Sequence, residues 1–335
     1  MLILGIETSC DETSVACVEN GTNILSVVTA TQISTHEKYG GVVPEIASRL
    51  HAETLESVTA SALKDAGVKL ENIDYIAATN GPGLLGSLLV GITFANALAL
   101  SKNKRCIGIN HLEAHIFSVF MEFSELKPPV IALLVSGGHT VIVKMDDFGK
   151  FLTIGHTLDD AAGESFDKIS FLLGLGYPGG PVIQNVSRNG DREAFKFPRA
   201  MMDHKRKYDF SFSGLKTSVI NKVRSINATP ENMEMKMKAD IAASFQEAVV
   251  DVLLHKTISA AEEYKVSTVI LAGGVAANSR LRQKMKDAGN SKGINVLWPS
   301  LKLCGDNGAM IAGLGFKKTE FAVEHIDDVS AVRNL

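Results

Sequence analysis

The first strand-turn-strand unit of the chain reads LILGIE-TSCDET-SVACVE, at residues 2–19. The runs at 2–7 and 14–19 are short and apolar, as strands are, and the polar residues 8–13 between them predict a turn. Asn20-Gly21 is a strong hairpin signal, so a third strand should follow it. The chain is therefore expected to open with antiparallel strands joined by a turn rich in hydroxyl and carboxyl groups.

The strand-turn-strand pattern recurs in the second half of the chain. Residues 130–135 and 141–145 are apolar runs, and Ser136-Gly137-Gly138-His139-Thr140 lies between them. Another apolar run, residues 268–272, ends directly before Gly273-Gly274. Two halves of this form predict an α/β fold with two related domains that face each other across a cleft.

We place these domains at residues 1–125 and 126–305. A helix over 306–335 is expected to pack back on the first domain. Hydrophobic periodicity and Pro44 predict a long helix whose core face carries Ile46, Leu50, Leu55, Val58 and Leu63. The expected helices span residues 44–66, 84–100, 161–173, 180–189 and 236–264, with one more from 278, and further strands span 73–79 and 106–109.

Length and composition indicate a folded protein of two domains. The chain has 335 residues, of which 45% are hydrophobic and 21% charged, and its net charge is -3. This composition argues against disorder and against nucleic-acid binding through global charge. The four cysteines form no CxxC pair, which favours a reduced, cytoplasmic compartment, and no signal peptide is visible.

Residues 75–101 contain no charged side chain. Asn80-Gly81-Pro82-Gly83 interrupts this run, so we interpret it as a buried strand, a turn and a buried helix rather than a membrane span. The helix has almost no polar face. Gly86, Gly91 and Ala95 offer small sites where a helix of a partner protein could approach closely.

His111-Leu112-Glu113-Ala114-His115 predicts a metal site. Two histidines four residues apart lie on one face of a helix, where both imidazoles can reach one ion. Asp306, in the turn Cys304-Gly305-Asp306-Asn307-Gly308, is the best candidate for a third ligand. The alternative is that the two histidines simply line a partly buried helix face.

Two glycine turns are candidate anion-binding sites. Ser136-Gly137-Gly138 and Gly273-Gly274 each follow an apolar strand, where a turn can present backbone N–H groups to a phosphate. Asp167 could accept ribose hydroxyls, or it could be a solvated carboxylate on a helix. Asn278 stands where a helix N-cap belongs.

The first turn and one basic segment complete the candidates. Asp11 and Glu12 could act as a general base or orient a substrate amine, or they could be solvated charges. Residues 188–207 contain seven Lys or Arg and three Asp or Glu, with Phe195, Phe197 and Tyr208 nearby. This basic segment is the best candidate for nucleic-acid binding, although a solvated loop would have the same composition.

Taken together, these motifs closely resemble the bacterial TsaD family, the tRNA adenosine threonylcarbamoyltransferases once described as glycoprotein endopeptidases. The similarity runs in order from residue 2 to about 313. The motifs that carry it are GIETSCDET (5–13), YGGVVPE (39–45), GPG (81–83), HLEAH (111–115), VSGGHT (135–140), GYPGG (176–180), FSGLKT (212–217) and GGVAAN (273–278).

The resemblance implies an actin-like, sugar-kinase and Hsp70 type of ATPase fold. It implies transfer of threonylcarbamoyl from threonylcarbamoyl-adenylate to adenosine 37 of tRNAs that read codons beginning with A. An iron ion would be held by His111, His115 and Asp306, with zinc or magnesium as alternatives. The adenylate would be held by Leu134, Val135, Ser136, Gly137, Gly138, Asp167, Gly180 and Asn278.

The same resemblance implies TsaB and TsaE as partner proteins, with a homodimer as the alternative when TsaB is absent. Three other functions remain open. A metallopeptidase would need H-E-x-x-H, but Leu112 takes the place of the glutamate. An ATP-dependent kinase or chaperone would share the fold, and a scaffold protein without catalytic activity would need no metal ligands.

Overall fold

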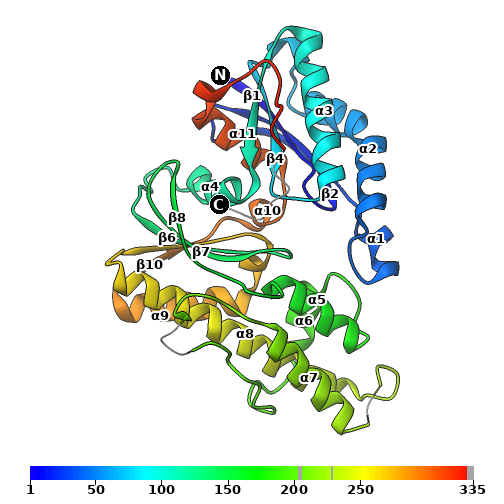
Figure 1. Cartoon of the computed structure of the whole chain (residues 1–335), viewed down its shortest axis with the longest axis vertical. Helices are drawn as coiled ribbons and strands as arrows, with labels where there is room; N and C mark the ends of the chain where they lie inside the picture. Colours follow the sequence, from blue (N-terminus) through cyan, green and yellow to red (C-terminus); the bar gives the residue numbers. More distant parts are fainter. Residues whose placement is uncertain (203–205, 228, 330–335) are drawn as a thin grey trace. The chain divides into compact units, whose positions relative to one another are not determined.

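The computed structural model describes residues 1–202, 206–227 and 229–329. These residues form two compact units (Figure 1). Unit 1 consists of Met1–Leu126 and Pro299–Leu335, and unit 2 of Lys127–Trp298. Each unit contains one five-stranded sheet with helices packed against it, which confirms the predicted α/β class.

The sheet of unit 1 has the order β3-β2-β1-β4-β5. The first three strands are antiparallel, while β4 and β5 run parallel to β1. The predicted hairpin turn at Asn20-Gly21 is confirmed, because it connects β2 to β3. The bounds are β1 Leu2–Glu7, β2 Glu12–Glu19, β3 Asn23–Thr31, β4 Tyr75–Gly81 and β5 Arg105–Asn110.

Helices cover both faces of this sheet, which explains why β1 and β4 are buried along almost their whole length. Leu4 and Ile6 pack in one core with α2 and α3, whereas Gly5 faces α11. A Cβ on Gly5 would lie 2.2 Å from the carbonyl oxygen of Gly308, so the close approach of α11 requires glycine. The helices of unit 1 are α1 Ile33–His36, η1 Glu37–Tyr39, α2 Pro44–Asp65, η2 Leu70–Asn72, α3 Leu85–Lys102, α4 His111–Glu122, α10 Leu301–Cys304, α11 Gly308–Lys317 and η5 Thr319–Phe321.

The core face predicted for α2 was partly wrong. Leu55 and Val58 are buried as expected, but Ile46, Leu50 and Leu63 are only half-buried. The buried stripe instead runs through Ala47, His51, Leu55, Val58 and Ala62. Small and polar side chains thus lie where large apolar ones were expected, because α2 approaches β2 and β3 closely.

The sheet of unit 2, β10-β9-β6-β7-β8, repeats the arrangement of unit 1. Strands β6, β7 and β8 are antiparallel, and β9 and β10 run parallel to β6. The bounds are β6 Val130–Val135, β7 Thr140–Asp147, β8 Lys150–His156, β9 Thr268–Ala272 and β10 Asn295–Leu297. The helices are α5 Ala162–Leu172, α6 Gly179–Ser187, α7 Ser213–Ser225, α8 Met235–Glu263, η4 Gly274–Ala277 and α9 Ser279–Lys292.

The C-terminal segment differs from the helix expected over 306–335. The last α-helix, α11, ends at Lys317, and the chain then pairs Val323 with Cys106 beside β5. Residues 330–335 lie outside the described part of the chain. Helix α11 contacts β1, β2 and α4, all of which belong to unit 1.

Helix α3 is the one described helix long and apolar enough to cross a membrane. A single helix of this kind is weak evidence, because core helices of soluble proteins meet the same criteria. Here α3 buries Leu88, Ile92 and Ala95 against its own unit. This agrees with the interpretation of residues 75–101 as a strand, a turn and a helix.

Candidate metal centre and substrate turns

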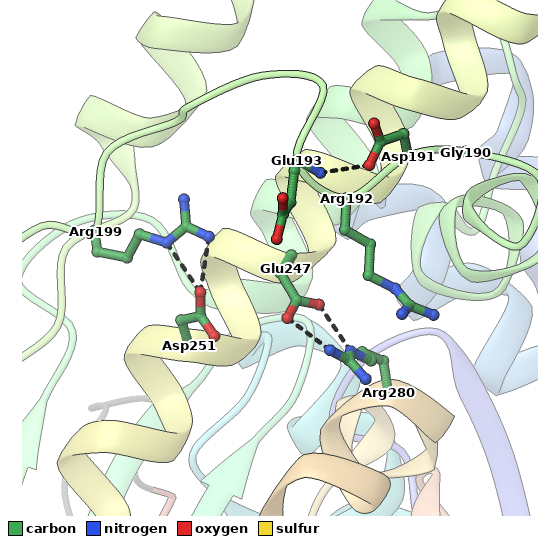
Figure 2. A pocket seen from close by; sticks show the side chains of 8 residues that line it. All are labelled: Gly190, Asp191, Arg192, Glu193, Arg199, Glu247, Asp251 and Arg280. Atoms are coloured by element: carbon green, nitrogen blue, oxygen red, sulfur yellow. Dashed lines mark hydrogen bonds and ion pairs between the residues drawn. The ribbon is translucent and has the colours of Figure 1, made fainter.

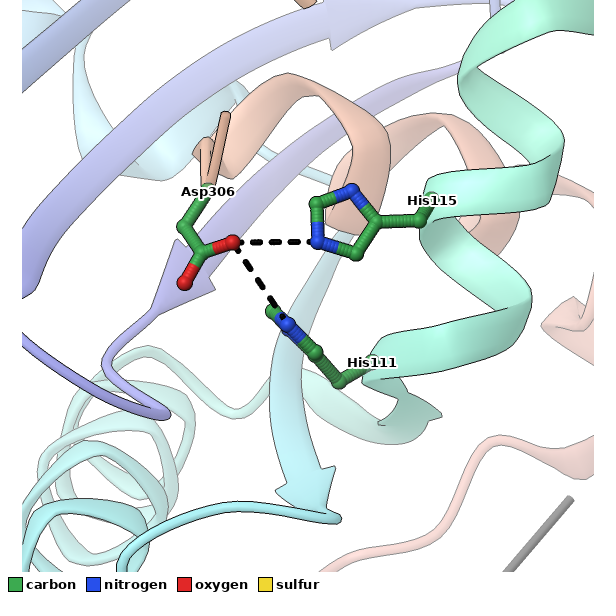
Figure 3. Close-up of side chains that lie close together, drawn as sticks. All are labelled: His111, His115 and Asp306. Atoms are coloured by element: carbon green, nitrogen blue, oxygen red, sulfur yellow. Dashed lines mark hydrogen bonds and ion pairs between the residues drawn. The ribbon is translucent and has the colours of Figure 1, made fainter. Parts of the chain in front are cut away.

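The two histidines lie at the start of α4. Asn110 ends β5 and caps the helix, since its side-chain oxygen accepts hydrogen bonds from the N–H groups of Leu112 and Glu113. The helix therefore begins at His111, and His115 follows one turn later on the same face. Both side chains point toward Asp306 (Figure 3).

Asp306 comes from the far end of the chain. It directly precedes Asn307, which caps α11 by accepting a hydrogen bond from the N–H of Met310. The N–H of Gly308 donates to the Ser14 hydroxyl at 3.0 Å, which ties the start of α11 to β2. These contacts fix the backbone on which the Asp306 carboxylate depends.

The three side chains form a compact donor set that could hold a metal ion. Asp306 Oδ1 lies 3.0 Å from His115 Nε2 and 3.5 Å from His111 Nε2. One ligand atom from each residue lies within 4.8 Å of the others. Two donors bound at about 2.1 Å to one ion lie roughly 3–3.5 Å apart, and the two distances to Asp306 fall in this range.

Glu7, which the sequence analysis did not single out, orients His111. Its Oε2 lies 3.0 Å from His111 Nδ1, and its Oε1 accepts the N–H of Ser9. Burial opposes ionisation of Glu7, but the charge and hydrogen bond of His111 outweigh it and lower the pKa of Glu7. A carboxylate behind one ring nitrogen leaves the other free to bind a metal, as in many metalloproteins.

The nearby turn adds two further carboxyl groups, Asp11 and Glu12. Burial, followed by the charges of Asp306 and Asp11, raises the pKa of Glu12 to about 10. Four carboxyl groups (Glu7, Asp11, Glu12 and Asp306) thus influence one another in a buried region. A bound cation would relieve this repulsion, so the charge balance and the donor set both fit a metal.

The predicted phosphate turn of unit 2 joins β6 to β7. Gly137 and Gly138 are exposed, and a Cβ on either would meet no atom within 4 Å. Within the described residues, neither N–H has a hydrogen-bond acceptor. The carbonyls of Ser136 and Gly137 accept bonds from Gly163 and Glu164 at the start of α5, which holds the turn open.

The other predicted substrate residues of unit 2 lie near this turn. Gly273 has φ +86° and packs on the backbone of Val135, so the Gly273-Gly274 turn lies beside the end of β6. Asp167 Oδ1 accepts the N–H of Gly179 at 2.7 Å, which joins α5 to the start of α6. Gly180 is the next residue, and a Cβ there would meet open space.

Two of the predicted residues can offer only backbone groups. The side chains of Leu134 and Val135 are fully buried in β6. Asn278 is confirmed as a helix N-cap, because its Oδ1 accepts from Arg280 and Leu281. Its Nδ2 donates to Gln246 Oε1 at 2.8 Å, so both ends of this amide stabilise the protein itself.

The basic segment at residues 188–207 is less free than its composition indicates. Arg199 pairs with Asp251 at 2.7 Å, and Lys207 pairs with Glu263. Phe197 and Tyr208 are buried in the core of unit 2, so they are not available to stack on bases. Residues 203–205, which include Lys205, lie outside the described part of the chain.

A charged cavity of about 510 Å³ lies beside this segment (Figure 2). Its arginines Arg199 and Arg280 are held by Asp251 and Glu247. Arg192 also lines it, and no described residue forms an ion pair with its guanidinium. The cavity has both signs of charge, and it contains none of the predicted metal or adenylate residues.

The repeated strand order of the two units belongs to the actin-like class of ATPase folds. The structure of T. kodakarensis HypF is similar to this chain, at 16% identity and a TM-score of 0.63. The match covers 99% of this chain and 49% of the HypF chain. The activator of the 2-hydroxyisocaproyl-CoA dehydratase from Clostridium difficile matches 96% of both chains, at 16% identity and a TM-score of 0.56. At these identities the similarity concerns the fold alone.

Sequence comparison identifies the family within this class. The family profile described as TsaD, tRNA N6-adenosine threonylcarbamoyltransferase, matches residues 23–313. A protein of that name from Thermosipho africanus is 51% identical, over 100% of this chain and 99% of the relative. One from Clostridium botulinum is 50% identical, over 99% of this chain and 97% of the relative. The chain belongs to the TsaD family.

Proposed function

We propose that the protein transfers a threonylcarbamoyl group from threonylcarbamoyl-adenylate to the exocyclic amine of adenosine 37 in tRNAs that read codons beginning with A. The observation that carries this proposal is the His111-His115-Asp306 donor set, backed by Glu7, in a chain of the TsaD family. A new bond forms between the amine nitrogen and the carbamoyl carbon. The bond from that carbon to the phosphate oxygen breaks, and AMP leaves.

His111, His115 and Asp306 would hold the metal, for which we propose Fe²⁺. Two histidines and one carboxylate with open positions are a donor set typical of non-haem iron, and zinc also accepts it. When bound, the ion would supply positive charge for phosphate or carbamoyl oxygens. The residues around it hold His111 in one orientation and keep the cluster largely buried.

In unit 2, the free N–H groups of Gly137 and Gly138 are suited to the phosphate of the adenylate. Asp167 is proposed to contact the ribose, and Gly180 leaves space for the nucleoside to approach. Leu134 and Val135 would contribute through the backbone alone. The amide of Asn278 would act mainly by capping α9.

The nucleophile is a weakly basic amine, so a group that removes its proton during attack would help. Asp11 and Glu12, in the turn beside the metal ligands, are the candidates for this role. Glu12 could fill it once a bound cation lowers its raised pKa. Asp11→Asn and Glu12→Gln variants would distinguish them. Only loss of the base should lower the rate of transfer while the binding of threonylcarbamoyl-adenylate is retained.

The geometry is less favourable for the rival functions. A peptidase of the H-E-x-x-H type would use a glutamate beside the metal, but Leu112 is buried and Glu113 forms an ion pair with Lys318. A kinase or chaperone would need only the fold, and a scaffold would need neither the donor set nor Glu7. The metal donors therefore favour the transferase.

We further propose that the protein acts in the cytoplasm with TsaB and TsaE, or as a homodimer when TsaB is absent. One feature of α3 supports a partner surface: Leu85, Leu89 and Leu100 are 54%, 46% and 71% exposed. Of the small residues predicted for this contact, Gly91 and Ala95 are buried within unit 1, whereas Gly86 is exposed. Gly91 packs on Thr8 and Gly86 on Ser48, both within unit 1.

The proposal is tested by incubating the metal-loaded protein with its partners, unmodified tRNA and threonylcarbamoyl-adenylate. Released AMP should equal the threonylcarbamoyl-adenosine found after digestion of the tRNA. ATP in place of the adenylate, or a peptide in place of tRNA, should give no product. Phosphorylation of a substrate from ATP, or peptide cleavage, would favour a rival function.

A further inference from the structure

The turn between β1 and β2 is fixed by three successive carbonyl groups. The Ser9 carbonyl accepts the N–H of Leu84 at 2.8 Å, and the Asp11 carbonyl accepts the N–H of Gln32 at 3.0 Å. Between them, the Cys10 carbonyl lies 3.0 Å from His51 Nε2. His51 is therefore the side chain that completes this set, and it approaches from α2.

The hydrogen-bond partners determine which nitrogen of His51 carries the proton. A carbonyl can only accept, so Nε2 must carry hydrogen and donate to Cys10. Nδ1 then accepts, from the Thr13 hydroxyl at 2.7 Å and more weakly from Gln32 Nε2 at 3.4 Å. Burial lowers the pKa of His51, which agrees with a neutral ring.

A second histidine fixes the orientation of Gln32. The N–H of Val43 donates to His36 Nδ1 at 3.3 Å, so His36 must donate from Nε2. That nitrogen lies 3.0 Å from Gln32 Oε1, and the amide nitrogen of Gln32 consequently faces His51. His36 and His51 are fully buried and Gln32 is 6% exposed, so water cannot replace these partners.

We propose that His51 is a positioning residue of the transfer site, which fixes the turn carrying Asp11 and Glu12 through its hydrogen bond to Cys10. This inference rests on the proposed function. His51 itself touches neither the metal donors nor the glycine turns in any hydrogen bond of the described residues. It acts by holding the backbone from which the two carboxylates project.

Two substitutions distinguish the effect of the hydrogen bond to Cys10 from the effect of losing the rest of the imidazole ring. In His51→Gln the amide nitrogen can reach the position of Nε2 and still donate to Cys10. In His51→Asn the shorter amide reaches only the position of Nδ1. We expect His51→Asn to lower kcat for transfer by about ten- to a hundredfold, since small displacements of reacting groups have effects of this size.

His51→Gln should keep kcat within about threefold of the wild type, because it retains the donor. Bound metal and the KM for the adenylate should be unchanged in both variants. Thr59→Val is the matched control, since Thr59 lies two turns further along α2, is buried, and has a hydroxyl without a partner among the described residues. A wild-type kcat in His51→Asn, or equal losses in both His51 variants, would overturn the proposal.

A measurement without turnover separates this inference from the proposed function. NMR of the wild-type protein with ¹⁵N-labelled histidine reports the tautomer of each ring, and His51→Gln identifies the signals of residue 51. We expect hydrogen on Nε2 and none on Nδ1. Hydrogen on Nδ1 would overturn the inference even in an active enzyme, whereas an inactive wild type with the expected tautomer would count against the proposed function alone.

Discussion

The buried contact between Glu7 and His111 orients the imidazole of His111 for metal binding. Glu7 ends β1 and is fully buried. One of its carboxylate oxygens faces His111, and the other accepts a hydrogen bond from the backbone N–H of Ser9. An imidazole that faces this carboxylate through Nδ1 presents Nε2 to the cluster. His115 has no such support, because its Nδ1 has no hydrogen-bond partner among the described residues. The two histidines should therefore respond differently to changes around them.

We predict that His111→Ala abolishes metal binding, whereas Glu7→Gln weakens it by about ten- to a hundredfold, the usual effect of losing a carboxylate behind a ligand. Metal titration with elemental analysis measures both, and circular dichroism checks the fold. His156→Ala, which removes an exposed histidine outside the cluster, should bind metal normally. Full metal occupancy in His111→Ala would refute the assigned ligand.

Glu247 provides a prediction about pH. Burial opposes its ionisation, but hydrogen bonds from Arg280 and Lys284 outweigh burial and lower its pKa from 4.5 to about 2. A carboxyl group whose pKa is lowered in the folded state stabilises the protein above its unfolded pKa, and the effect fades as pH falls toward the folded pKa. The shift corresponds to about 3 kcal/mol.

Glu247→Gln should accordingly lower the thermal midpoint at neutral pH. The difference from the wild type should shrink between pH 4.5 and about 2, the two pKa values. Thermal unfolding over a pH series measures this. Glu71→Gln removes an exposed ion pair with Lys102 and should change little. A difference that stays constant down to pH 2 would show that the charge of Glu247 is not its cause.

The basic segment is expected to contact phosphates rather than bases, because two of its aromatic neighbours are buried. Exposed Arg188, Arg192 and Lys196 form no ion pair within the described residues. Reversing all three to Glu should weaken tRNA binding and reduce the slope of log affinity against log salt by about 2. Binding at several salt concentrations provides the measurement.

A control variant changes the net charge by the same amount, but at positions outside the segment. Lys64, Lys265 and Lys286 are exposed and lie on other elements, so reversing them alters the total charge equally. This triple variant should bind tRNA with nearly the wild-type slope. Equal loss in both triple variants would mean that total charge, rather than the segment, governs binding.

Helix α3 exposes leucines on a face that its own unit does not cover. Leu89→Arg should disrupt the proposed complex with TsaB, or the proposed homodimer, while the monomer stays folded, because burying an unpaired charge in an apolar contact is costly. Leu152→Arg on β8, where the leucine is 52% exposed, is the matched control. Light scattering that shows an intact complex after Leu89→Arg and Leu85→Arg would place the interface elsewhere.

Most elements could be predicted because local signals define them. Val130–Val135 and Thr268–Ala272 are strands at the predicted bounds, and Asn278 caps α9 as expected. Helix α7 could not be predicted from local signals, because its first residue, Ser213, is held by Asp159, 54 residues away. Strands β8 and β10 were also not predicted, because β8 is a mostly exposed edge strand and β10 has only three residues.

The candidate site shows the same division between local and distant contacts. The four-residue spacing predicted that His111 and His115 share a helix face. Glu7 and His51 were missed because their partners, His111 and Cys10, are 104 and 41 residues away in sequence. A glutamate that ends an apolar strand was the one available signal for Glu7.

The chain as a whole contains two copies of one sheet topology with different chemistry. The turn after the first strand carries Asp11 and Glu12 in unit 1, whereas the corresponding turn in unit 2 carries Ser136-Gly137-Gly138. The candidate bases and metal donors thus belong to unit 1, and the N–H groups of Gly137 and Gly138 to unit 2.

The most direct test of this account follows the bond that it predicts. The metal-loaded protein and its partners are given threonylcarbamoyl-adenylate with ¹³C in the carbamoyl group and tRNA with ¹⁵N in the exocyclic amine of adenosine 37. The nucleoside recovered after digestion should contain both labels and show a one-bond coupling between ¹³C and ¹⁵N. Recovery of the ¹³C on a protein side chain, on a ribose hydroxyl, or only as hydrolysed threonylcarbamate would contradict the proposed transfer.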